Sequence, residues 1–336
     1  MKQNKSAPTR RDVAERAGVS VTIVSYVLNN NRYVAKEKRD RVLQAVKELH
    51  YRPNTVARAL KGKKSNHILF IADNISNEHF GKIVEEMDRI AYDKGYLISL
   101  LADRNDDEFV AQVNSRQVDG IVISSASFEE RYVRQLIDTD IPVVLLLNRK
   151  YGLLGGNVGK IDTGLYRGMK ECVKFLAGKG RRNLIYIDRV SRSGRFSTME
   201  DLRFCAFCEQ IRDSGLELTE ERVITGCEDE QALFRAVCGR IRGGLAVDGI
   251  VGRNDNMACA AMEAVLACGK RVPQDVSVIG FDNSRMSRYV KPALTSMEID
   301  RPAIARAIIT MLDAMIAGES VEDMEFGTKL IEREST

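Results

Sequence analysis

The sequence predicts an α/β protein with a small all-α head at its N-terminus. Two observations lead to this class. Residues 1–64 combine an excess of positive charge with the apolar spacing of short helices, and from His67 onward apolar strand-like runs alternate with amphipathic helical segments. A length of 336 residues, with 44% apolar and 29% charged residues, suits a globular chain of two or three domains.

Charge separates the head from the rest of the chain. Residues 1–64 hold 16 Lys and Arg against 5 Asp and Glu, a net +11, whereas residues 65–336 hold 35 against 42, a net −7. A basic head on an acidic body indicates a nucleic-acid-binding module. The alternative, a solvated basic tail, is weakened because the same residues have helical periodicity, which a tail would lack.

The head is predicted to contain a helix-turn-helix. Thr9 and Asp12 have the spacing of a capping box at the start of a first helix. Gly18 ends that helix, because glycine tolerates the left-handed conformation that follows a helix C-terminus, and Ser20 caps a second helix. A third helix is expected over roughly 36–49. The residues expected to face the core of the head are Val13, Ala14, Ala17, Val24, Val27, Leu28, Val42, Val46 and Leu49.

The second helix is the candidate DNA-reading element. A tight turn before it would project its N-terminal end into a major groove about 12 Å wide. The side chains that the core of the head does not need, and that we expect at base edges, are Val21, Thr22, Ser25 and Tyr26. Polar side chains suited to contacts with the DNA backbone are Ser20, Asn29, Tyr33 and Asn54.

The body alternates strands and helices, which predicts parallel sheets covered on both faces. Strands are expected at Ile68–Ala72, Leu97–Ala102, Gly120–Ser124, Val143–Leu147, Leu184–Asp188, Gly249–Val251 and Val276–Gly280. Helices are expected at Glu78–Lys94, Asp107–Arg116, Glu129–Ile137, Gly164–Ala177, Thr198–Ser214, Glu230–Ile241, Asn256–Cys268 and Pro302–Ala317. A short repeat, Val118-Asp119-Gly120-Ile121-Val122 and Val247-Asp248-Gly249-Ile250-Val251, is consistent with two similar lobes in tandem.

Three segments of the head give the sequence a specific resemblance. They are Asp12-Val13-Ala14-Glu15-Arg16-Ala17-Gly18-Val19-Ser20, then Val24-Ser25 with Val27-Leu28-Asn29, and Tyr51-Arg52-Pro53-Asn54-Thr55-Val56-Ala57-Arg58-Ala59-Leu60. Together they resemble the head and hinge of the lactose/galactose repressor (LacI/GalR) family. The resemblance extends over essentially the whole chain and is sharper in the head than in the body.

The resemblance implies roles for residues of the head and the hinge. Val21, Thr22 and Tyr26 fall where the family contacts bases in the major groove. Tyr26 departs from the more usual Arg or His, and a phenol cannot make the bidentate guanine contact of an arginine. Ala57 and Leu60 match the residues that paired hinge helices insert into the minor groove, where an apolar wedge kinks the duplex. The alternative for Leu60 is ordinary core packing.

The resemblance also implies the domain plan. Residues 1–50 would form the helix-turn-helix head, 51–65 the hinge helix and linker, and 66–336 a periplasmic-binding-protein-like body for effector binding and dimerisation. The body would consist of two doubly wound parallel-sheet lobes. Lobe 1 is expected at about 66–163 plus 294–323, and lobe 2 at about 164–293 plus 324–336, with the ligand in the cleft between them.

Polar residues just past strand ends are the candidates for that cleft. Asn254-Asp255 and Gly280-Phe281-Asp282 resemble two motifs of the family, and Arg203 matches its effector-binding arginine. An arginine that faces carboxylates can hold a polyol, because hydroxyls both accept and donate. The predicted effector-binding residues are Phe80, Asn148, Arg149, Arg203, Asn254, Asp255 and Asp282. The alternative for each residue is a helix cap or a surface ion pair.

The charge of the effector stays open at this point. Arg149, Arg203 and Arg253 lie at strand ends, and the loop 191–195 adds two further arginines. Several guanidinium groups suit a phosphate or carboxylate, so a phosphorylated sugar or another small anion is an alternative to a neutral sugar. The competing interpretation is that Arg149 and Arg253 face solvent or pair with carboxylates.

No enzyme, metal or cofactor pattern is present in the sequence. It lacks HExxH, GxSxG and phosphate-loop motifs, and seven scattered cysteines indicate reduced thiols rather than a disulfide framework. Cys205-Ala206-Phe207-Cys208 is a single CxxC in an apolar helix, for which core packing is the preferred interpretation. No apolar run approaches a membrane span and no signal sequence is evident, so we expect a cytoplasmic protein without membrane attachment.

These observations together predict a homodimeric transcription regulator, expected to be a repressor. It would bind a near-palindromic operator in double-stranded DNA and respond to a small-molecule effector, a sugar or sugar derivative. Two other classes remain as alternatives. A solute-binding receptor would need a signal sequence and has no use for a basic head, and an α/β enzyme would need a catalytic constellation that the sequence lacks.

Overall fold

The structure is a computed structural model that describes residues 8–30, 32–51 and 64–336. The chain divides into two compact units, Met1–Ser65 and Asn66–Thr336. The predicted residues Asn54, Ala57 and Leu60 lie outside the described residues. The two units are the head and the body of the sequence analysis, and each is described by itself.

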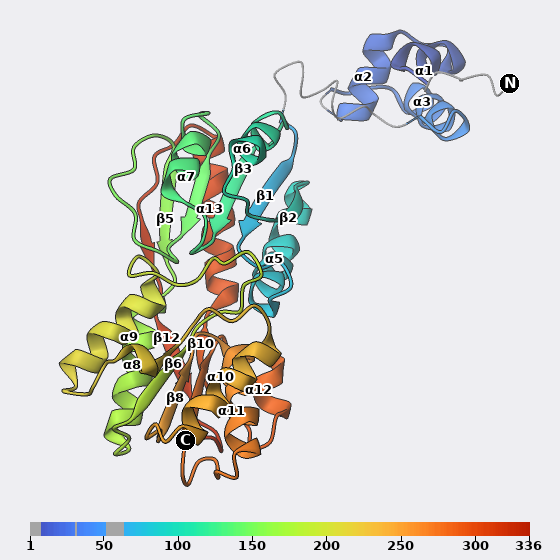
Figure 1. The fold of residues 1–336 in the computed structure, drawn as a ribbon. Helices are drawn as coiled ribbons and strands as arrows, with labels where there is room; N and C mark the ends of the chain where they lie inside the picture. Colours follow the sequence, from blue (N-terminus) through green and yellow to red (C-terminus); the bar gives the residue numbers. More distant parts are fainter. Residues whose placement is uncertain (1–7, 31, 52–63) are drawn as a thin grey trace, which may run out of the picture. The chain divides into compact units, whose positions relative to one another are not determined.

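The described part of the head contains three helices, α1 (Arg10–Ala17), α2 (Val21–Asn29) and α3 (Lys36–Glu48) (Figure 1). Thr9 and Asp12 form the predicted capping box, and Gly18 ends α1 in the left-handed conformation with φ of +62°. Ser20 caps α2 by accepting a hydrogen bond from the backbone N–H of Ile23. The helices enclose a small apolar core made of Val13, Ala14, Ala17, Val24, Val27, Val42, Ala45 and Tyr51.

The body is built on two six-stranded sheets, and each defines one lobe. The first sheet has the order β11-β5-β4-β3-β1-β2 and the second has the order β12-β10-β9-β8-β6-β7. Neighbouring strands run parallel except for β10 and β12, which are antiparallel. The strands of the first sheet are β1 (His67–Ala72), β2 (Leu97–Ala102), β3 (Gly120–Ser124), β4 (Val143–Leu146), β5 (Val158–Asp162) and β11 (Met324–Glu325). Those of the second are β6 (Leu184–Ile187), β7 (Val223–Ile224), β8 (Gly249–Gly252), β9 (Ser277–Phe281), β10 (Thr295–Ile299) and β12 (Thr328–Ile331).

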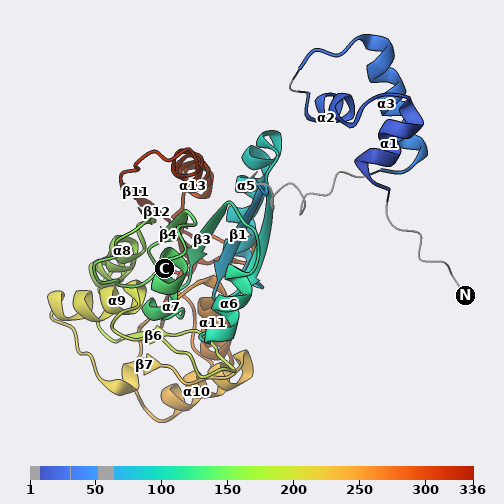
Figure 2. The same cartoon turned by 90° about the horizontal axis from the view of Figure 1, so that it is seen from above.

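Helices cover both faces of the sheets. In lobe 1, α6 (Asp107–Asn114) and α7 (Glu130–Ile137) lie on one face, and α5 (Glu78–Ala91) and α13 (Arg301–Ile316) lie on the other (Figure 2). In lobe 2, α8 (Leu165–Gly178) and α9 (Leu202–Asp213) cover one face, and α10 (Glu230–Arg242) and α11 (Asp255–Ala267) cover the other. A short helix, α12 (Arg285–Tyr289), follows β9, and two 3₁₀ turns lie at Tyr92–Lys94 and Glu220–Arg222.

The predicted lobe boundaries at residues 294 and 324 are wrong by one strand each. Strand β10 pairs with β9 and β12 and therefore belongs to lobe 2, although residues 294–323 were assigned to lobe 1. Strand β11 pairs with β5 and therefore belongs to lobe 1, although residues 324–336 were assigned to lobe 2. The chain thus crosses between the lobes after β5, after β10 and after β11.

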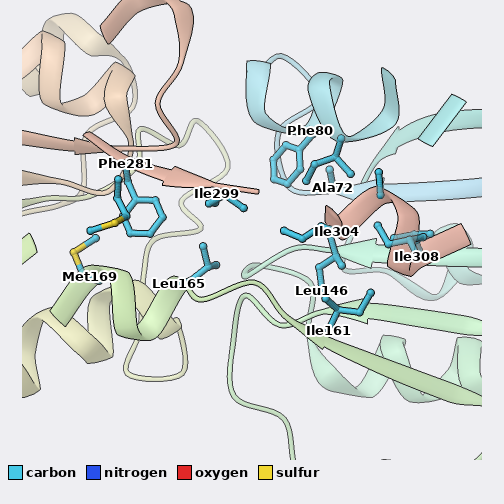
Figure 3. Close-up of a cluster of buried hydrophobic side chains, with 14 of the residues drawn as sticks. Ala72, Phe80, Leu146, Ile161, Leu165, Met169, Phe281, Ile299, Ile304 and Ile308 are labelled. Atoms are coloured by element: carbon cyan, nitrogen blue, oxygen red, sulfur yellow. The ribbon is translucent and has the colours of Figure 1, made fainter. Parts of the chain in front are cut away.

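The apolar core is continuous across the crossings between the lobes. One buried cluster contains Phe80 and Ile304 of lobe 1, Ile299 at a crossing, and Leu165 and Phe281 of lobe 2. Figure 3 shows Ile299 and Leu165 between the side chains of the two lobes. Because burial of apolar side chains is the main stabilising contribution to folding, this shared cluster holds the two lobes together where the chain crosses between them.

Candidate functional site

The N-terminal half of α2 presents the predicted DNA-reading side chains on the surface of the head. Val21 is 44% exposed and Thr22 is exposed, whereas Ser25 and Tyr26 are half-buried. The ring of Tyr26 lies under the guanidinium of Arg32, 5.2 Å from its carbon to the ring centroid. This cation–π contact fixes the orientation of the phenol beside a positive charge.

The predicted backbone-contacting residues surround this surface. Ser20 is exposed at the start of α2, and Asn29 is half-buried and donates a hydrogen bond to the hydroxyl of Ser25 at 3.1 Å. Tyr33 is 94% exposed in the loop that follows. Tyr33 also lines a shallow basic hollow with Asn30, Arg32, Val34, Lys36 and Arg39. Backbone N–H groups at a helix start and exposed cations beside it are the groups that contact phosphates.

A second site lies in the body, where a cavity of about 310 Å³ opens between the lobes. Side chains at the ends of strands and at the N-termini of α5, α9 and α11 line it. Lobe 1 contributes Asp73, Asn74, Asn77, His79, Phe80, Ser127 and Asn148, and lobe 2 contributes Arg189–Ser193, Arg195, Arg203, Arg253, Asn254 and Asp282. The cavity is the one that open α/β sheets form at the carboxyl ends of their strands.

Five of the seven predicted effector residues line this cavity, namely Phe80, Asn148, Arg203, Asn254 and Asp282. Two do not. The guanidinium of Arg149 is turned to the carboxylate of Glu200 and to the carbonyl of Phe128, so this arginine pairs within the protein, as the competing interpretation had it. Asp255 lies below the cavity wall, where its carboxylate accepts hydrogen bonds from the Ser296 hydroxyl at 2.5 Å and the Ser284 N–H at 2.6 Å.

Arg203 and Asp282 form an ion pair in the lining of the cavity. Nη2 of Arg203 lies 3.0 Å from Oδ1 of Asp282, and Nη1 donates to the carbonyl of Arg253 at 3.1 Å. The guanidinium also lies over the ring of Phe281, at 4.7 Å. Nε of Arg203 is buried and has no hydrogen-bond partner. A buried donor without a partner is costly, so a ligand that accepts from Nε would gain a hydrogen bond at this point.

Asp282 has a strained backbone conformation. Its φ is +100°, in a region that residues other than glycine rarely adopt. The conformation is held by two backbone contacts: the N–H of Asp282 donates to the carbonyl of Met297 at 2.8 Å, and Arg301 donates to the carbonyl of Asp282. Such strain is found at ligand sites, where the surrounding structure maintains it.

His79 is a cavity residue that the sequence analysis missed. Its Nδ1 lies 3.7 Å from Oδ1 of Asp282, beyond hydrogen-bond distance, and has no partner. Burial lowers the pKa of His79 to about 3, with further contributions from Arg301 and Arg203, although Asp282 opposes the shift. The imidazole is therefore neutral at physiological pH.

A network of ion pairs also lies at the cavity, and the sequence analysis anticipated only the alternative in which Arg253 pairs with a carboxylate. Arg189 bridges Asp73 of lobe 1 and Asp201 of lobe 2, at 3.0 and 2.6 Å, and Arg253 lies 2.9 Å from Asp201. Despite its burial, Asp201 has a lowered pKa, because Arg253, Arg189 and Arg203 together outweigh the cost of desolvation. Arg195 reaches the buried Asp103 of lobe 1 in the same way. The only available signal was the position of Asp73, Asp103 and Arg189 just after strand ends.

Two further findings concern metal ions and membranes. Among them, no group of three or more His, Cys, Asp or Glu side chains is arranged to hold a metal ion. None of the helices in the described ranges is both long and apolar enough to cross a membrane.

Comparison with known proteins gives consistent matches over the whole chain. Residues 9–54 match the family described as bacterial regulatory proteins, lacI family, and residues 173–336 match the periplasmic binding protein-like domain. A curated relative, the HTH-type transcriptional repressor PurR of Serratia proteamaculans, is 30% identical over 97% of this chain and 96% of its own length.

Two solved structures illustrate the same similarity. The lac repressor dimer bound to operator and the anti-inducer ONPF has a TM-score of 0.82 at 23% identity and covers 98% of this chain and 99% of its own. A LacI-type regulator from Alkaliphilus metalliredigens complexed with D-xylulofuranose has a TM-score of 0.66 at 29% identity, covering 81% of this chain and 99% of its own. The chain belongs to the lacI family of bacterial regulatory proteins.

Proposed function

We propose that the protein is a homodimeric transcriptional repressor whose affinity for a near-palindromic operator is set by a small neutral polar effector. The effector binds in the cavity between the lobes, and the helix-turn-helix head binds DNA in the cytoplasm. The observation that carries the proposal is the buried Arg203–Asp282 pair in the wall of a cavity that both lobes line. The PurR proteins of Serratia proteamaculans and Pectobacterium carotovorum, to which the chain is similar over 97% of its length, are transcriptional repressors.

The balance of charge around the cavity favours a neutral effector. Five arginines line it, and four of them already have carboxylate partners: Arg189 with Asp73 and Asp201, Arg195 with Asp103, Arg203 with Asp282, and Arg253 with Asp201. Arg192 is exposed, and among the described residues no carboxylate pairs with it. An anionic effector would have to compete with four carboxylates, whereas hydroxyl groups fit between paired donors and acceptors. The relative that holds D-xylulofuranose supports a sugar as the effector.

The polar atoms of the cavity suit a polyol. Nε of Arg203 and Nε of Arg189 are buried donors without partners. Asn148 and Asn254 add amide groups at the ends of β4 and β8, and Phe80 adds an apolar surface. A sugar has hydroxyls that can hydrogen-bond to the arginine and asparagine side chains, and C–H faces that can pack on the Phe80 ring. Small-molecule sites commonly combine a few polar groups with apolar surface in this way.

Effector binding is coupled to DNA binding through the relative positions of the lobes. Asp73 and Asp103 of lobe 1 pair with Arg189 and Arg195 of lobe 2 across the cavity. A ligand that interacts better with one spacing of the lobes shifts the population toward it. The hinge segment, which lies between the head and lobe 1 in the sequence, would transmit this shift to the heads.

The DNA-binding roles of the head residues follow from the same proposal. Val21, Thr22, Ser25 and Tyr26 contact base edges in the major groove, and Ser20, Asn29, Tyr33 and Asn54 contact the backbone. Ala57 and Leu60 enter the minor groove at the centre of the operator. Two heads of a dimer would bind half-sites about one helical turn apart, which makes the operator near-palindromic.

The proposal is tested by a thermal-shift panel on the full chain. Neutral pentoses and hexoses are compared with their phosphate esters, for the wild type and for Arg203→Ala, because a ligand that binds only the native state raises Tm by mass action. We expect neutral sugars to stabilise the wild type and not Arg203→Ala. Stabilisation by phosphate esters alone would show that the effector is an anion, and equal stabilisation of both proteins would place the ligand elsewhere.

A further inference from the structure

Two cysteines meet on the face of lobe 2 that α10 and α11 cover. Cys238 lies in the third turn of α10, and Cys268 follows the last residue of α11. The Cys238 thiol donates to the carbonyl of Ala264 at 3.5 Å, and the backbone N–H of Cys268 donates to the same carbonyl at 3.1 Å. The Cys268 thiol is also near enough to contribute to the raised pKa of Cys238. The carbonyl of Ala264 therefore brings the Cys238 sulfur next to the backbone of Cys268.

The members of this pair differ in their access to solvent. Cys238 is 5% exposed, whereas Cys268 is half-buried at the end of its helix. Burial, together with the neighbouring Cys268 sulfur, raises the pKa of the Cys238 thiol. Cys238 is therefore the enclosed, protonated member of the pair, and Cys268 is the member that solvent, and hence an oxidant, can reach.

The other cysteines lack this arrangement. All five of the others are buried: Cys172, Cys205, Cys208, Cys227 and Cys259. The sequence pair Cys205 and Cys208 lies within one helix, α9, and the Cys205 thiol donates to the carboxylate of Glu209 at 2.9 Å. The two cysteines of the CxxC are thus part of a helix core, as preferred from the sequence, and the pair that shares the Ala264 carbonyl is separated by thirty residues of sequence.

We propose that Cys238 and Cys268 are a site of reversible oxidation, at which a peroxide joins α10 to α11 through a disulfide. The Cys268 sulfur attacks one peroxide oxygen, the O–O bond breaks, and water leaves to give a sulfenic acid. The Cys238 sulfur then attacks the Cys268 sulfur, the S–S bond forms, the S–O bond breaks, and a second water carries away the thiol proton. Two thiols lose two electrons and the peroxide is reduced to two waters.

The cross-link would stabilise lobe 2 without altering the effector cavity. Asn254, the cavity residue of α11, caps the N-terminus of the helix, whereas Cys268 lies at the opposite end. A disulfide restricts the unfolded chain, and its loss or formation changes the Tm of a domain of this size by about 5–10 °C. A thiol reductant restores the two cysteines.

Peptide mapping of the full chain tests the site. The protein is treated with hydrogen peroxide or with dithiothreitol, free thiols are alkylated, and trypsin is added without reduction. Trypsin cuts after Arg240, Arg242 and Arg253, so the two cysteines lie on separate peptides unless a disulfide joins them. We expect a Cys238–Cys268 cross-linked peptide after peroxide treatment only, a Tm raised by about 5 °C or more, and reversal of both by dithiothreitol.

Matched variants distinguish a specific Cys238–Cys268 disulfide from non-specific oxidation of other cysteines. Cys238→Ser and Cys268→Ser should each lose the cross-link and the shift of Tm, and Cys259→Ser, a change elsewhere in α11, should keep both. Conversion of Cys268 to a sulfinic acid with no linked peptide, or cross-links only between separate chains, would overturn the proposal. Should a serine variant fail to fold, the peptide map of the wild type decides the question.

Discussion

The start of α2 and the cavity between the lobes are both candidate binding surfaces, but their side chains have opposite surroundings. Val21 and Thr22 are exposed in the first turn of α2. Arg203 and Arg253 are buried, and each is held by a carboxylate far away in the sequence. The charged groups of the second surface already pair within the protein, so removal of one partner would leave the other charge buried and unpaired.

The largest effect is expected where the buried network is broken. Arg253→Ala leaves Asp201 buried with one of its arginines removed, and loss of one partner of a buried pair costs about 3–5 kcal/mol. The free energy of unfolding, measured by urea denaturation, should fall by that amount. The exposed pair Arg271–Asp275 serves as the control, and Arg271→Ala should leave stability nearly unchanged. Equal small losses in both variants would show that the buried network does not support the lobe.

A pH titration tests a second buried carboxylate beside the cavity. Burial, followed by the charge of Asp282, raises the pKa of Asp255 from 3.8 to about 7. The native state then binds more protons than the unfolded state between these values, so the free energy of unfolding should fall as pH rises from about 4 to above 7. The loss is up to about 4 kcal/mol, and it should disappear in Asp255→Asn. A pH profile that is identical in the two proteins would contradict the assignment.

The head and the body also differ in how much of their structure the sequence could predict. The helices of the head were placed correctly because their signals are local: a capping box at Thr9, a glycine at Gly18 and a hydroxyl cap at Ser20. In the body, β10 was missed because buried Thr295 and Ser296 give it a polar sequence. Their hydroxyls are satisfied by Thr336, Arg333 and Asp255, contacts that only the folded chain creates.

The cavity was predicted only in part, for a related physical reason. Arg203 and Asp282 could be found from their motifs. The partners that fix the cavity could not, because Asp73 and Arg189 are 116 residues apart and Asp103 and Arg195 are 92 residues apart. Arg149 was predicted to line the cavity because it follows a strand. Its guanidinium instead pairs with Glu200, which is 51 residues away in the sequence.

Salt should distinguish the two surfaces, because only one of them contacts a polyanion. Raising salt from 50 to 200 mM should weaken binding of the full chain to duplex DNA by about a hundredfold or more, since cations of the head displace condensed counterions. Fluorescence anisotropy of a labelled duplex measures this. The fragment 65–336 is the control and should bind no DNA. A salt-independent affinity, or equal binding by the fragment, would contradict the role of the head.

A smaller effect is expected from one side chain on α2. Tyr26→Ala removes a ring beside Arg32 and a phenol at the proposed base-contacting position, so affinity for the operator should fall by about 1–3 kcal/mol. Tyr26→Phe separates the hydroxyl from the ring. The two variants should lose less on random duplex than on the operator selected by the wild type. Equal losses on both duplexes would assign Tyr26 to the DNA backbone or to the head core.

The most direct test of the central claim is the operator affinity of the wild type and of Arg203→Ala, each with and without the sugar that most stabilises the wild type. The proposed coupling predicts that the sugar changes the Kd of the wild type for operator about tenfold or more. In Arg203→Ala, the ratio of the Kd with sugar to the Kd without sugar should fall to one. The Kd without sugar should be the same in both proteins, because Arg203 lies in the body and not in the head. An unchanged ratio in the variant, or loss of operator binding without sugar, would contradict control of the head from this cavity.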